Sequence, residues 1–161
     1  MGNEHNSVVE ALRAKWPEAI ERVVVDRGQW IVYIDPEVIE PVCRFLKEEH
    51  NFNRLVGITA VDWFPREPRF EVVYLLHSLQ AHQRLRLKCR LPGQEPRIGS
   101  VTAVWKSANW YEREVYDLFG IRFEGHPNLR RILLPEDWEG HPLRKDYPIH
   151  GHRYDYGALE R

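Results

Sequence analysis

Cysteine is scarce in this sequence, and the two cysteines stand alone. Cys43 and Cys89 lie far apart, and neither belongs to a CxxC pair. A disulfide scaffold, or a zinc or iron–sulfur site held by thiolates, needs several cysteines at close spacing. We therefore expect two buried free thiols.

Long apolar runs are also missing. The richest stretch, residues 55–61, is far shorter than the roughly 20 apolar residues that cross a bilayer. The polar start, residues 1–7, lacks the basic and apolar regions of a signal peptide. We therefore expect a soluble, cytoplasmic chain.

An excess of charge of one sign is the third absence. The chain has 23 basic and 24 acidic residues and a formal net charge of -1. A protein that binds nucleic acid through bulk charge would carry a clear excess of Lys and Arg. Apolar residues make up 43% of the 161 residues, which argues against global disorder and leaves room for one domain with an extension.

Helix and strand patterns occur in blocks up to Gly120. Apolar residues at helical spacing predict one helix that Ser7 caps and Pro17 ends, and another that begins at Asp35. A third begins at Ser107 and stops at Gly120, a typical residue after a helix end. The predicted strands are residues 20–25, 30–34, 55–63, 70–77 and 83–91.

Blocks of helices and strands, without strict βαβ alternation, favour an α+β fold. We predict two layers: a mostly antiparallel sheet of about five strands and two to three helices. The predicted division is an α+β domain over residues 1–120 and an extended partner-docking tail over residues 121–161.

One predicted strand carries four cations on one face. Residues 83–91 alternate strictly, with Arg84, Arg86, Lys88 and Arg90 opposite the apolar face. A solvated sheet face, or an edge strand that its charges protect from aggregation, is the first interpretation. A protein partner is the second. Nucleic acid is disfavoured, because no aromatic residues alternate with the cations.

The tail has neither helical nor strand periodicity. Four prolines and four glycines interrupt residues 121–161, yet the segment keeps leucines, tyrosines and Trp138. Long irregular stretches are uncommon inside compact domains, and disordered segments are poor in apolar residues. A proline also favours extended backbone at the residue before it, such as His126 before Pro127, and extended backbone needs hydrogen-bond partners. We therefore expect another protein to cover the tail, with Trp, Tyr and Arg as anchors.

Metal binding and acid–base catalysis are the alternatives for the polar residues. His150 and His152 could hold zinc with Asp146 and Asp155, but nothing in the pattern fixes further ligands. Glu112, Glu114 and Asp117 could serve as acid–base carboxylates. We favour hydrogen bonding at an interface for the histidines, and an ion-pair network with Arg113, which lies four positions before Asp117, for the acids.

Residues 110–148 contain a set of closely spaced motifs. They are Glu112-Arg113-Glu114, Asp117-Leu118-Phe119-Gly120-Ile121, His126-Pro127, Leu129-Arg130-Arg131-Ile132-Leu133 and Gly140-His141-Pro142-Leu143-Arg144-Lys145-Asp146-Tyr147-Pro148. Together they closely resemble the 30-kDa-subunit family of respiratory complex I, to which the C subunit of proton-pumping NADH:quinone oxidoreductase belongs.

The resemblance implies a non-catalytic subunit in the peripheral arm of the complex, on the cytoplasmic face of the inner (cell) membrane. It implies contacts with the hydrogenase-like D subunit and with the B subunit, which carries the terminal iron–sulfur cluster. It also implies that FMN and the iron–sulfur clusters are bound by other subunits. A homologous subunit of a membrane-bound hydrogenase or ferredoxin-linked complex is an open alternative, and a free-standing enzyme or nucleic-acid-binding module is a more remote one.

The resemblance and the tail's composition together predict a partner interface, with no catalytic, cofactor or metal residue in this chain. The predicted interface residues are Glu112, Arg113, Glu114, Asp117, His126, Arg130, Arg131, Trp138, His141, Arg144, Lys145, Asp146 and Tyr147.

Truncation after Gly125 tests this view of the tail. We expect a folded domain that no longer co-purifies with the complex, because the anchoring side chains are gone. Pull-down from native membranes measures the loss. A truncated chain that still assembles into a complex with normal activity would contradict the docking role.

Overall fold

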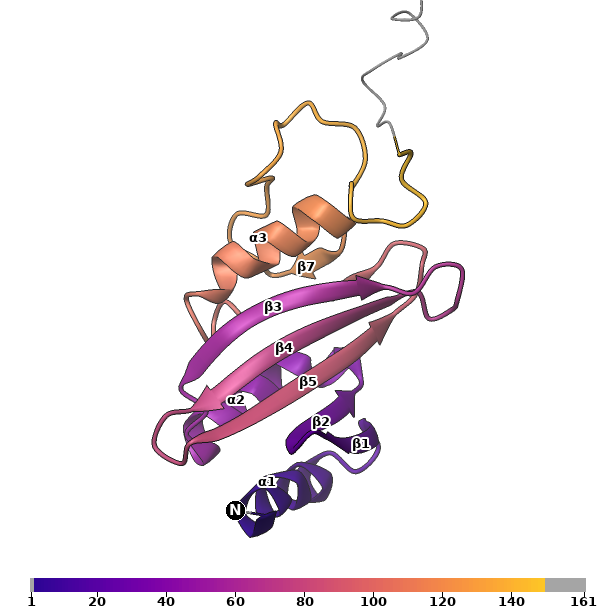
Figure 1. Ribbon diagram of the computed structural model, residues 1–161. Coiled ribbons are helices and arrows are strands. Elements are labelled where there is room, and N and C mark those ends of the chain that lie inside the picture. Colours follow the sequence, from indigo (N-terminus) through magenta and orange to yellow (C-terminus); the bar gives the residue numbers. More distant parts are fainter. Residues whose placement is uncertain (1, 150–161) are drawn as a thin grey trace, which may run out of the picture.

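A computed structural model of the chain describes the backbone of residues 2–149 and the side chains of residues 7–149. Its helices and strands follow one another along the chain as Figure 1 shows. They are α1 (Gly2–Lys15), β1 (Ile20–Asp26), β2 (Gln29–Ile34), the 3-10 turn η1 (Pro36–Val38), α2 (Ile39–His50), β3 (Arg54–Asp62), β4 (Phe70–Ser78), β5 (Gln83–Leu91), β6 (Arg97–Gly99), α3 (Ala108–Phe119) and β7 (Arg122–Glu124).

The main sheet has the strand order β1-β2-β5-β4-β3. Its neighbours are antiparallel except for β2 and β5, which pair in parallel. β3 and β4 form the far half of the sheet. β5 then lies between β4 and β2, antiparallel to β4 and parallel to β2. The prediction of an α+β fold with a mostly antiparallel sheet is confirmed.

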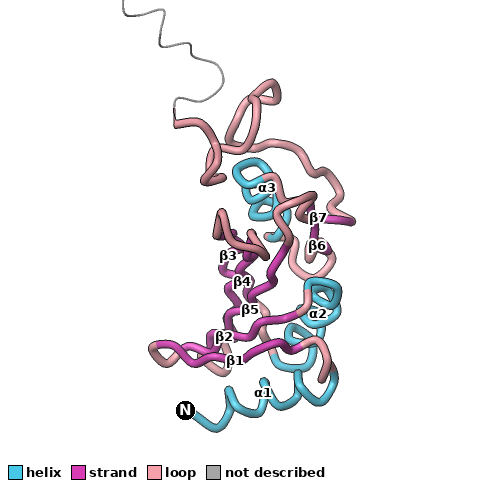
Figure 2. Tube along the Cα trace, turned by 90° about the vertical axis from the view of Figure 1, so that its right-hand side faces the viewer, coloured by secondary structure: helices cyan, strands magenta, loops and turns pink. Residues whose placement is uncertain are grey.

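One face of the sheet holds the core. Figure 2 shows α2 on this side, and the buried residues of α1 and α2 join those of the strands in one cluster. Val32, Leu87 and Tyr74 are completely buried there. The predicted free thiols are confirmed, since Cys43 and Cys89 are both free and buried. Burial raises the pKa of each thiol, which keeps both protonated and unreactive.

Strand β5 lies in the middle of the sheet, so the interpretation of residues 83–91 as an edge strand is wrong. β5 pairs with β2 on one side and with β4 on the other. Its alternation is confirmed: Leu85, Leu87, Cys89 and Leu91 are at most 2% exposed. The four cations therefore lie on the opposite face, which the core helices do not cover.

Two helix starts differ from the prediction. α1 begins at Gly2, so Ser7 lies within the helix and does not cap it. A serine followed three residues later by a glutamate is also common inside helices, which is why the pattern misled. At the second helix Asp35 accepts a hydrogen bond from the N–H of Glu37 at 2.9 Å, and regular α-helix begins only at Ile39.

A short parallel pair of strands was not predicted. Residues 97–99 lie outside the predicted strands and residues 122–124 lie in the predicted tail, but β6 and β7 pair in parallel. Their central side chains, Ile98 and Phe123, are 3% and 2% exposed. Three-residue strands are too short to show periodicity in a sequence. This pairing attaches the start of the predicted tail to the domain.

In the part of the chain that the structure describes, no helix has both the length and the apolar character needed to cross a bilayer.

Candidate functional site

The segment after β7 folds back beside α3, as Figures 1 and 2 both show. Residues 130–147 contact the C-terminal half of α3 through a dense set of hydrogen bonds, and we call them the capping segment. α3 ends at Gly120, as predicted, with Gly120 in the left-handed conformation at φ 74°. The polar groups at this end of α3 organise the site.

Asp117 is the centre of the capping segment. Its carboxylate is completely buried. One oxygen, Oδ2, accepts the backbone N–H groups of Ile132, Leu133 and Leu134 at 3.0, 2.8 and 2.9 Å. The other, Oδ1, accepts from Arg131 Nη1 at 2.7 Å. Three successive N–H groups that converge on one oxygen fix the local path of the chain.

The pKa of Asp117 is lowered despite burial. Burial alone acts to raise it, but the hydrogen bonds from the Leu134 N–H, the Arg131 guanidinium and the other two N–H groups outweigh this effect. The carboxylate is therefore charged at neutral pH. The stability that it contributes is present above its unfolded pKa and is lost as the pH falls through its folded pKa.

Arg131 connects the start of the capping segment to its middle. Besides Asp117 it donates through Nη2 to the carbonyls of Trp138 and Gly140, both at 2.9 Å. The planar guanidinium has five N–H donors in a fixed arrangement, which suits such a hub. The segment from residue 131 to 140 therefore closes into a loop around one side chain.

Arg113 holds the other side of this loop. Its Nε and Nη2 donate to the carbonyls of Arg130 and Arg131 at 3.1 and 3.0 Å. The guanidinium also lies 5.2 Å from the ring centre of Trp110. The predicted i,i+4 ion pair between Arg113 and Asp117 is wrong, because Asp117 pairs with Arg131, a residue 14 positions further along.

The second half of the capping segment satisfies the last carbonyls of α3. His141 donates its Nδ1–H to the Asp117 carbonyl at 2.8 Å, and Arg144 Nε donates to the Phe119 carbonyl at 2.6 Å. The N–H of Leu143 donates to the Leu118 carbonyl at 3.1 Å. The final carbonyls of a helix have no intrahelical partner, so this segment supplies what the helix lacks.

Gly120 allows this close approach. A Cβ atom at this position would lie 2.6 Å from Arg144 Nη2 and 2.6 Å from the His141 ring. Both the positive φ and the lack of space require glycine here.

An ion-pair cluster ties the end of the capping segment to the loop between β3 and β4. Arg69 Nη2 lies 2.8 Å from Asp62 Oδ2 and 2.6 Å from Asp146 Oδ1. Asp62 Oδ2 also accepts the N–H of Lys145 at 2.8 Å. Burial acts to raise the pKa of Asp62, but these hydrogen bonds lower it to about 2.

The sequence analysis missed Asp62 and Arg69, although one signal was available. Asp62 ends one strand and Arg69 directly precedes the next strand of the same antiparallel pair. Opposite charges at the two ends of a hairpin loop lie close together in space.

Glu112 and His126 form a second buried pair nearer the start of α3. Glu112 accepts from Ser100 Oγ and from the N–H of Val101, both at 2.7 Å. His126 Nδ1 accepts the N–H of Asn128, so the proton is on Nε2 and donates to the Asn109 carbonyl at 3.2 Å. Burial raises the pKa of Glu112 to about 7, because the two hydrogen bonds only partly compensate for desolvation.

Most of the predicted interface residues therefore make contacts within the chain. Residues that hold the capping segment or its surroundings are Glu112, Arg113, Asp117, His126, Arg131, His141, Arg144 and Asp146. Tyr147 donates to the Glu139 carbonyl at 3.3 Å, and Trp138 is half-buried. Glu114, Arg130 and Lys145 are exposed. Their contact with a partner stays a prediction.

The expectation that a neighbour must satisfy the tail's backbone is wrong for residues 130–147. Asp117 and Arg131 satisfy the backbone groups that an extended chain leaves open. The sequence did not show this because the partners lie far apart along the chain. Residues 150–161, with His150, His152 and Asp155, lie outside the described residues.

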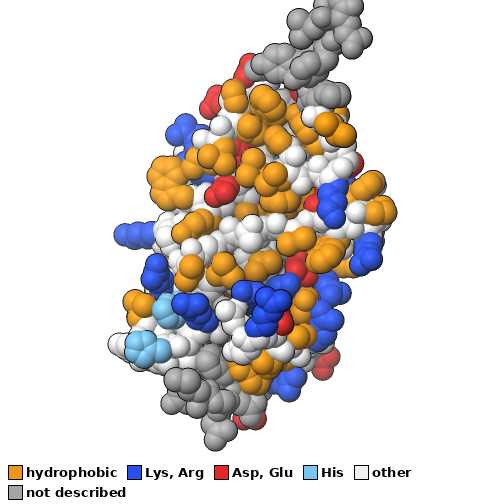
Figure 3. All heavy atoms as spheres, in the orientation of Figure 1, with side chains coloured by type: hydrophobic (Ala, Val, Ile, Leu, Met, Phe, Trp, Pro, Cys, Tyr) orange, Lys and Arg blue, Asp and Glu red, His pale blue; other side chains and the backbone are white. Residues whose placement is uncertain are grey.

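Apolar side chains remain exposed on the outside of this assembly. Leu133 and Leu143 of the capping segment are 61% and 51% exposed, and Trp110 of α3 is 61% exposed. Figure 3 shows hydrophobic side chains gathered over the upper part of the molecule, where α3 and the capping segment lie. Contiguous exposed apolar surface marks interaction sites.

Within residues 7–149 no three His, Cys, Asp or Glu side chains are grouped so that they could hold a metal ion. The buried polar groups of this site hold the chain in place, and Trp110, Leu133 and Leu143 expose apolar surface beside charged residues. This arrangement suits docking on a protein.

Comparison with known proteins gives a consistent result. The family model described as the respiratory-chain NADH dehydrogenase 30 Kd subunit matches residues 32–153. A relative from Geobacter sulfurreducens, the C subunit of an NADH-quinone oxidoreductase, is 49% identical over 149 residues, which are 92% of this chain and 92% of the relative.

Two solved structures resemble the fold. A trypsin-resistant fragment of Nqo5, residues 1–134, has a TM-score of 0.69 and 37% identity, and the match covers 78% of this chain and 99% of the fragment. A chain of an archaeal respiratory membrane complex, the membrane-bound sulfane sulfur reductase, has a TM-score of 0.78 and 30% identity, with 91% and 87% covered.

Substitution of Gly120 by alanine tests the close approach of the capping segment. Gly120→Ala should lower the free energy of unfolding by more than the roughly 1–2 kcal/mol that a left-handed backbone costs a non-glycine residue. The excess arises because His141 and Arg144 must move. Gly28→Ala is the matched control, since Gly28 has the same φ of 74° but nothing within 4 Å of the added Cβ. Equal losses in urea unfolding of the two full-length variants would contradict this account.

Substitution of Glu112 by glutamine tests the raised pKa. The folded state binds a proton at Glu112 more readily than the unfolded state does, so Glu112 makes stability fall as the pH rises from about 4.5 to about 7. Glu112→Gln should reduce this fall by up to about 3 kcal/mol, because glutamine stays neutral, and its oxygen can accept the Val101 N–H while its NH2 donates to Ser100 Oγ. Urea unfolding from pH 4.5 to 8 measures it. The exposed Glu114→Gln is the control, and identical pH profiles for wild type and Glu112→Gln would disprove the pKa shift.

Proposed function

The chain belongs to the respiratory-chain NADH dehydrogenase 30 Kd subunit family, and on that premise we propose that it acts as a non-catalytic, peripheral-arm subunit of NADH:quinone oxidoreductase. The oxidoreductase activity belongs to the whole complex. The observation that carries the proposal for this chain is the capping segment, whose backbone N–H groups and Arg131 bond inward to Asp117 while Leu133 and Leu143 are exposed.

Internal hydrogen bonds make the docking surface rigid before a partner arrives. The path of residues 131–134 is fixed by Asp117, and the path of residues 141–146 by Gly120, Arg69 and the end of α3. A preorganised surface loses little conformational entropy on binding, so more of the apolar contact energy contributes to affinity. The proposed docking role of residues 121–161 therefore refers, within the described residues, to the exposed apolar side chains of the folded residues 130–147.

The partners that we propose are the hydrogenase-like D subunit and the B subunit with the terminal iron–sulfur cluster. FMN and the iron–sulfur clusters would be bound by other subunits, and the chain would lie on the cytoplasmic face of the membrane. The family membership supports these assignments. The exposed charged residues of the segment, Arg130 and Lys145 together with Glu136, Asp137 and Glu139, suit a polar rim around an apolar contact.

A related membrane complex is the second candidate, because one solved relative comes from an archaeal sulfane sulfur reductase. Sequence identity to that relative is 30%, against 49% to the relative from the Geobacter NADH-quinone oxidoreductase. The difference favours the NADH:quinone oxidoreductase.

Truncation after Gly125 does not separate docking from folding, because it would leave Asp117 and Arg113 buried without their partners. Loss of one member of a buried charge pair costs about 3–5 kcal/mol. Surface substitutions avoid this problem.

The double variant Leu133→Ser, Leu143→Ser should leave the isolated chain as stable as the wild type, since both side chains are more than half exposed. It should reduce co-purification with the complex at least about tenfold, because apolar anchors dominate interface energies. Quantitative pull-down from native membranes and NADH:quinone activity measure the effect. Val25→Ser, which changes a 53% exposed residue of β1, is the control. Normal assembly and activity of the double variant would rule out this docking surface.

A further inference from the structure

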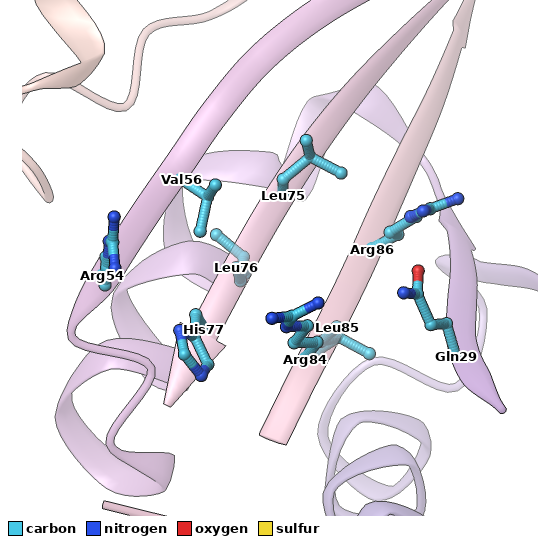
Figure 4. A pocket seen from close by; sticks show the side chains of 9 residues that line it. All are labelled: Gln29, Arg54, Val56, Leu75, Leu76, His77, Arg84, Leu85 and Arg86. Carbon is cyan, nitrogen blue, oxygen red and sulfur yellow. The ribbon is translucent and has the colours of Figure 1, made fainter. Parts of the chain in front are cut away.

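A second surface lies on the open face of the main sheet, at the end where β3 begins and the turn between β4 and β5 lies. Figure 4 shows a hollow there, of about 320 Å³, formed by side chains of β2 to β5. Its members that matter here are Arg54, Val56, Leu75, His77, Arg84 and Arg86. None of them belongs to the capping segment or contacts α3 through an ion pair.

The strand register places two arginines and a histidine in one row. Arg54 of β3 lies opposite His77 of β4, and His77 lies opposite Arg84 of β5. Residues directly opposite one another share a face of the sheet and have Cβ atoms roughly 5 Å apart. Arg86 follows on the same face of β5. Arg84 and Arg86 are the nearest like charges, and Arg54 lies two strands away from Arg84 with His77 between them. This accumulation of positive charge on one face is unfavourable.

No carboxylate compensates this row within residues 7–149, where none of the three arginines forms an ion pair. The other end of the same face is different. There Lys88 lies 2.7 Å from Glu71, and Arg22 and Arg90 lie over the ring of Tyr33 at 4.1 and 5.0 Å. The sheet therefore neutralises or stacks its cations at one end and leaves them uncompensated at the other.

The centre of the hollow is apolar. Val56 is 42% exposed and Leu75 is partly exposed. In Figure 4 these two side chains lie between Arg54 on one side and Arg84 and Arg86 on the other. An apolar patch inside a cationic border can pack against an apolar side chain, with carboxylates around it that pair with the arginines.

We propose that this hollow is a second docking site, which binds an acidic segment of a neighbouring protein subunit with an apolar side chain flanked by Asp or Glu. The inference rests on the proposed function, because that neighbour is another member of the same complex. Positive charges that are grouped without ion pairs inside the chain lower its stability. Such unfavourable local arrangements are typical of functional sites. Arginine's planar fork matches carboxylates in two-point pairs, which gives such a contact its geometry.

A protein segment fits better than a membrane or a nucleic acid. Adsorption to a bilayer strengthens with the apolar area that it buries, and among the residues that line the hollow only Val56 and Leu75 supply exposed apolar surface. Nucleic acid would require stacking aromatics among the cations or a basic chain overall. No aromatic lines the hollow apart from His77, and the net charge of the chain is -1.

The test is the double charge reversal Arg54→Glu, Arg84→Glu in the intact complex, with Arg13→Glu on the exposed surface of α1 as the control. The complex is purified from membranes at increasing NaCl, and the retained fraction of this chain is measured. We expect the salt concentration that releases half of the chain to fall at least about twofold for the double variant and to stay unchanged for Arg13→Glu. The neutral variant Arg54→Gln, Arg84→Gln should lie between them.

Thermal unfolding of the isolated full chain separates docking from folding. The double reversal should melt at or above the wild-type temperature at low salt, because it relieves the repulsion in the row. Lower stability together with release would indicate a structural role and overturn the inference. Unchanged release would overturn it as well, while the proposed function would stand. If the wild-type chain does not co-purify with NADH:quinone oxidoreductase at all, the proposed function itself is wrong.

Two further measurements identify the occupant. A photo-crosslinking amino acid in place of Val56 should capture another protein of the complex through an acid-rich peptide, and substitution of those acids by arginine should restore retention of the double reversal variant. Flotation with vesicles of phosphatidylcholine and phosphatidylglycerol should show no binding. Flotation of the wild type that Arg54→Glu, Arg84→Glu abolishes would assign the site to anionic lipid and overturn the inference.

Discussion

The buried carboxylate of Asp117 is the interaction on which the shape of the C-terminal half depends. A buried charge without partners is costly, and Asp117 obtains four hydrogen bonds from residues 131–134. Since these donors come from backbone as well as from Arg131, the carboxylate determines the path of the chain and not only a side-chain position. The polar groups of Arg113, His141 and Arg144 extend the same principle along α3.

The fold was largely predictable from the sequence, because its elements have strong local signals. Strand β5 alternates buried and more exposed residues along its whole length, and α3 is followed by a glycine whose φ is 74°. The short strands β6 and β7 gave no such signal. Their pairing depends on the burial of Ile98 and Phe123, which only the three-dimensional arrangement shows.

The connections between the residues that the motifs singled out were not predictable. The structure brings Asp117 and Arg131 together, whereas the helical spacing rule favoured Arg113 as the partner of Asp117. A spacing rule considers only neighbours along one helix, whereas the Asp117–Arg131 pair joins a helix to a loop. The same limit hid Arg69, whose partners Asp62 and Asp146 lie in two different segments.

The Asp62–Arg69–Asp146 cluster affects how the stretch between β7 and residue 146 opens locally. It ties residue 146 to the loop between β3 and β4, while the pairing of β6 with β7 ties the start of the same stretch to the domain. Anchored at both ends, this stretch cannot peel away gradually from one terminus. Its local opening must break several contacts at once, so hydrogen exchange in residues 132–134 should follow one cooperative event together with the end of α3.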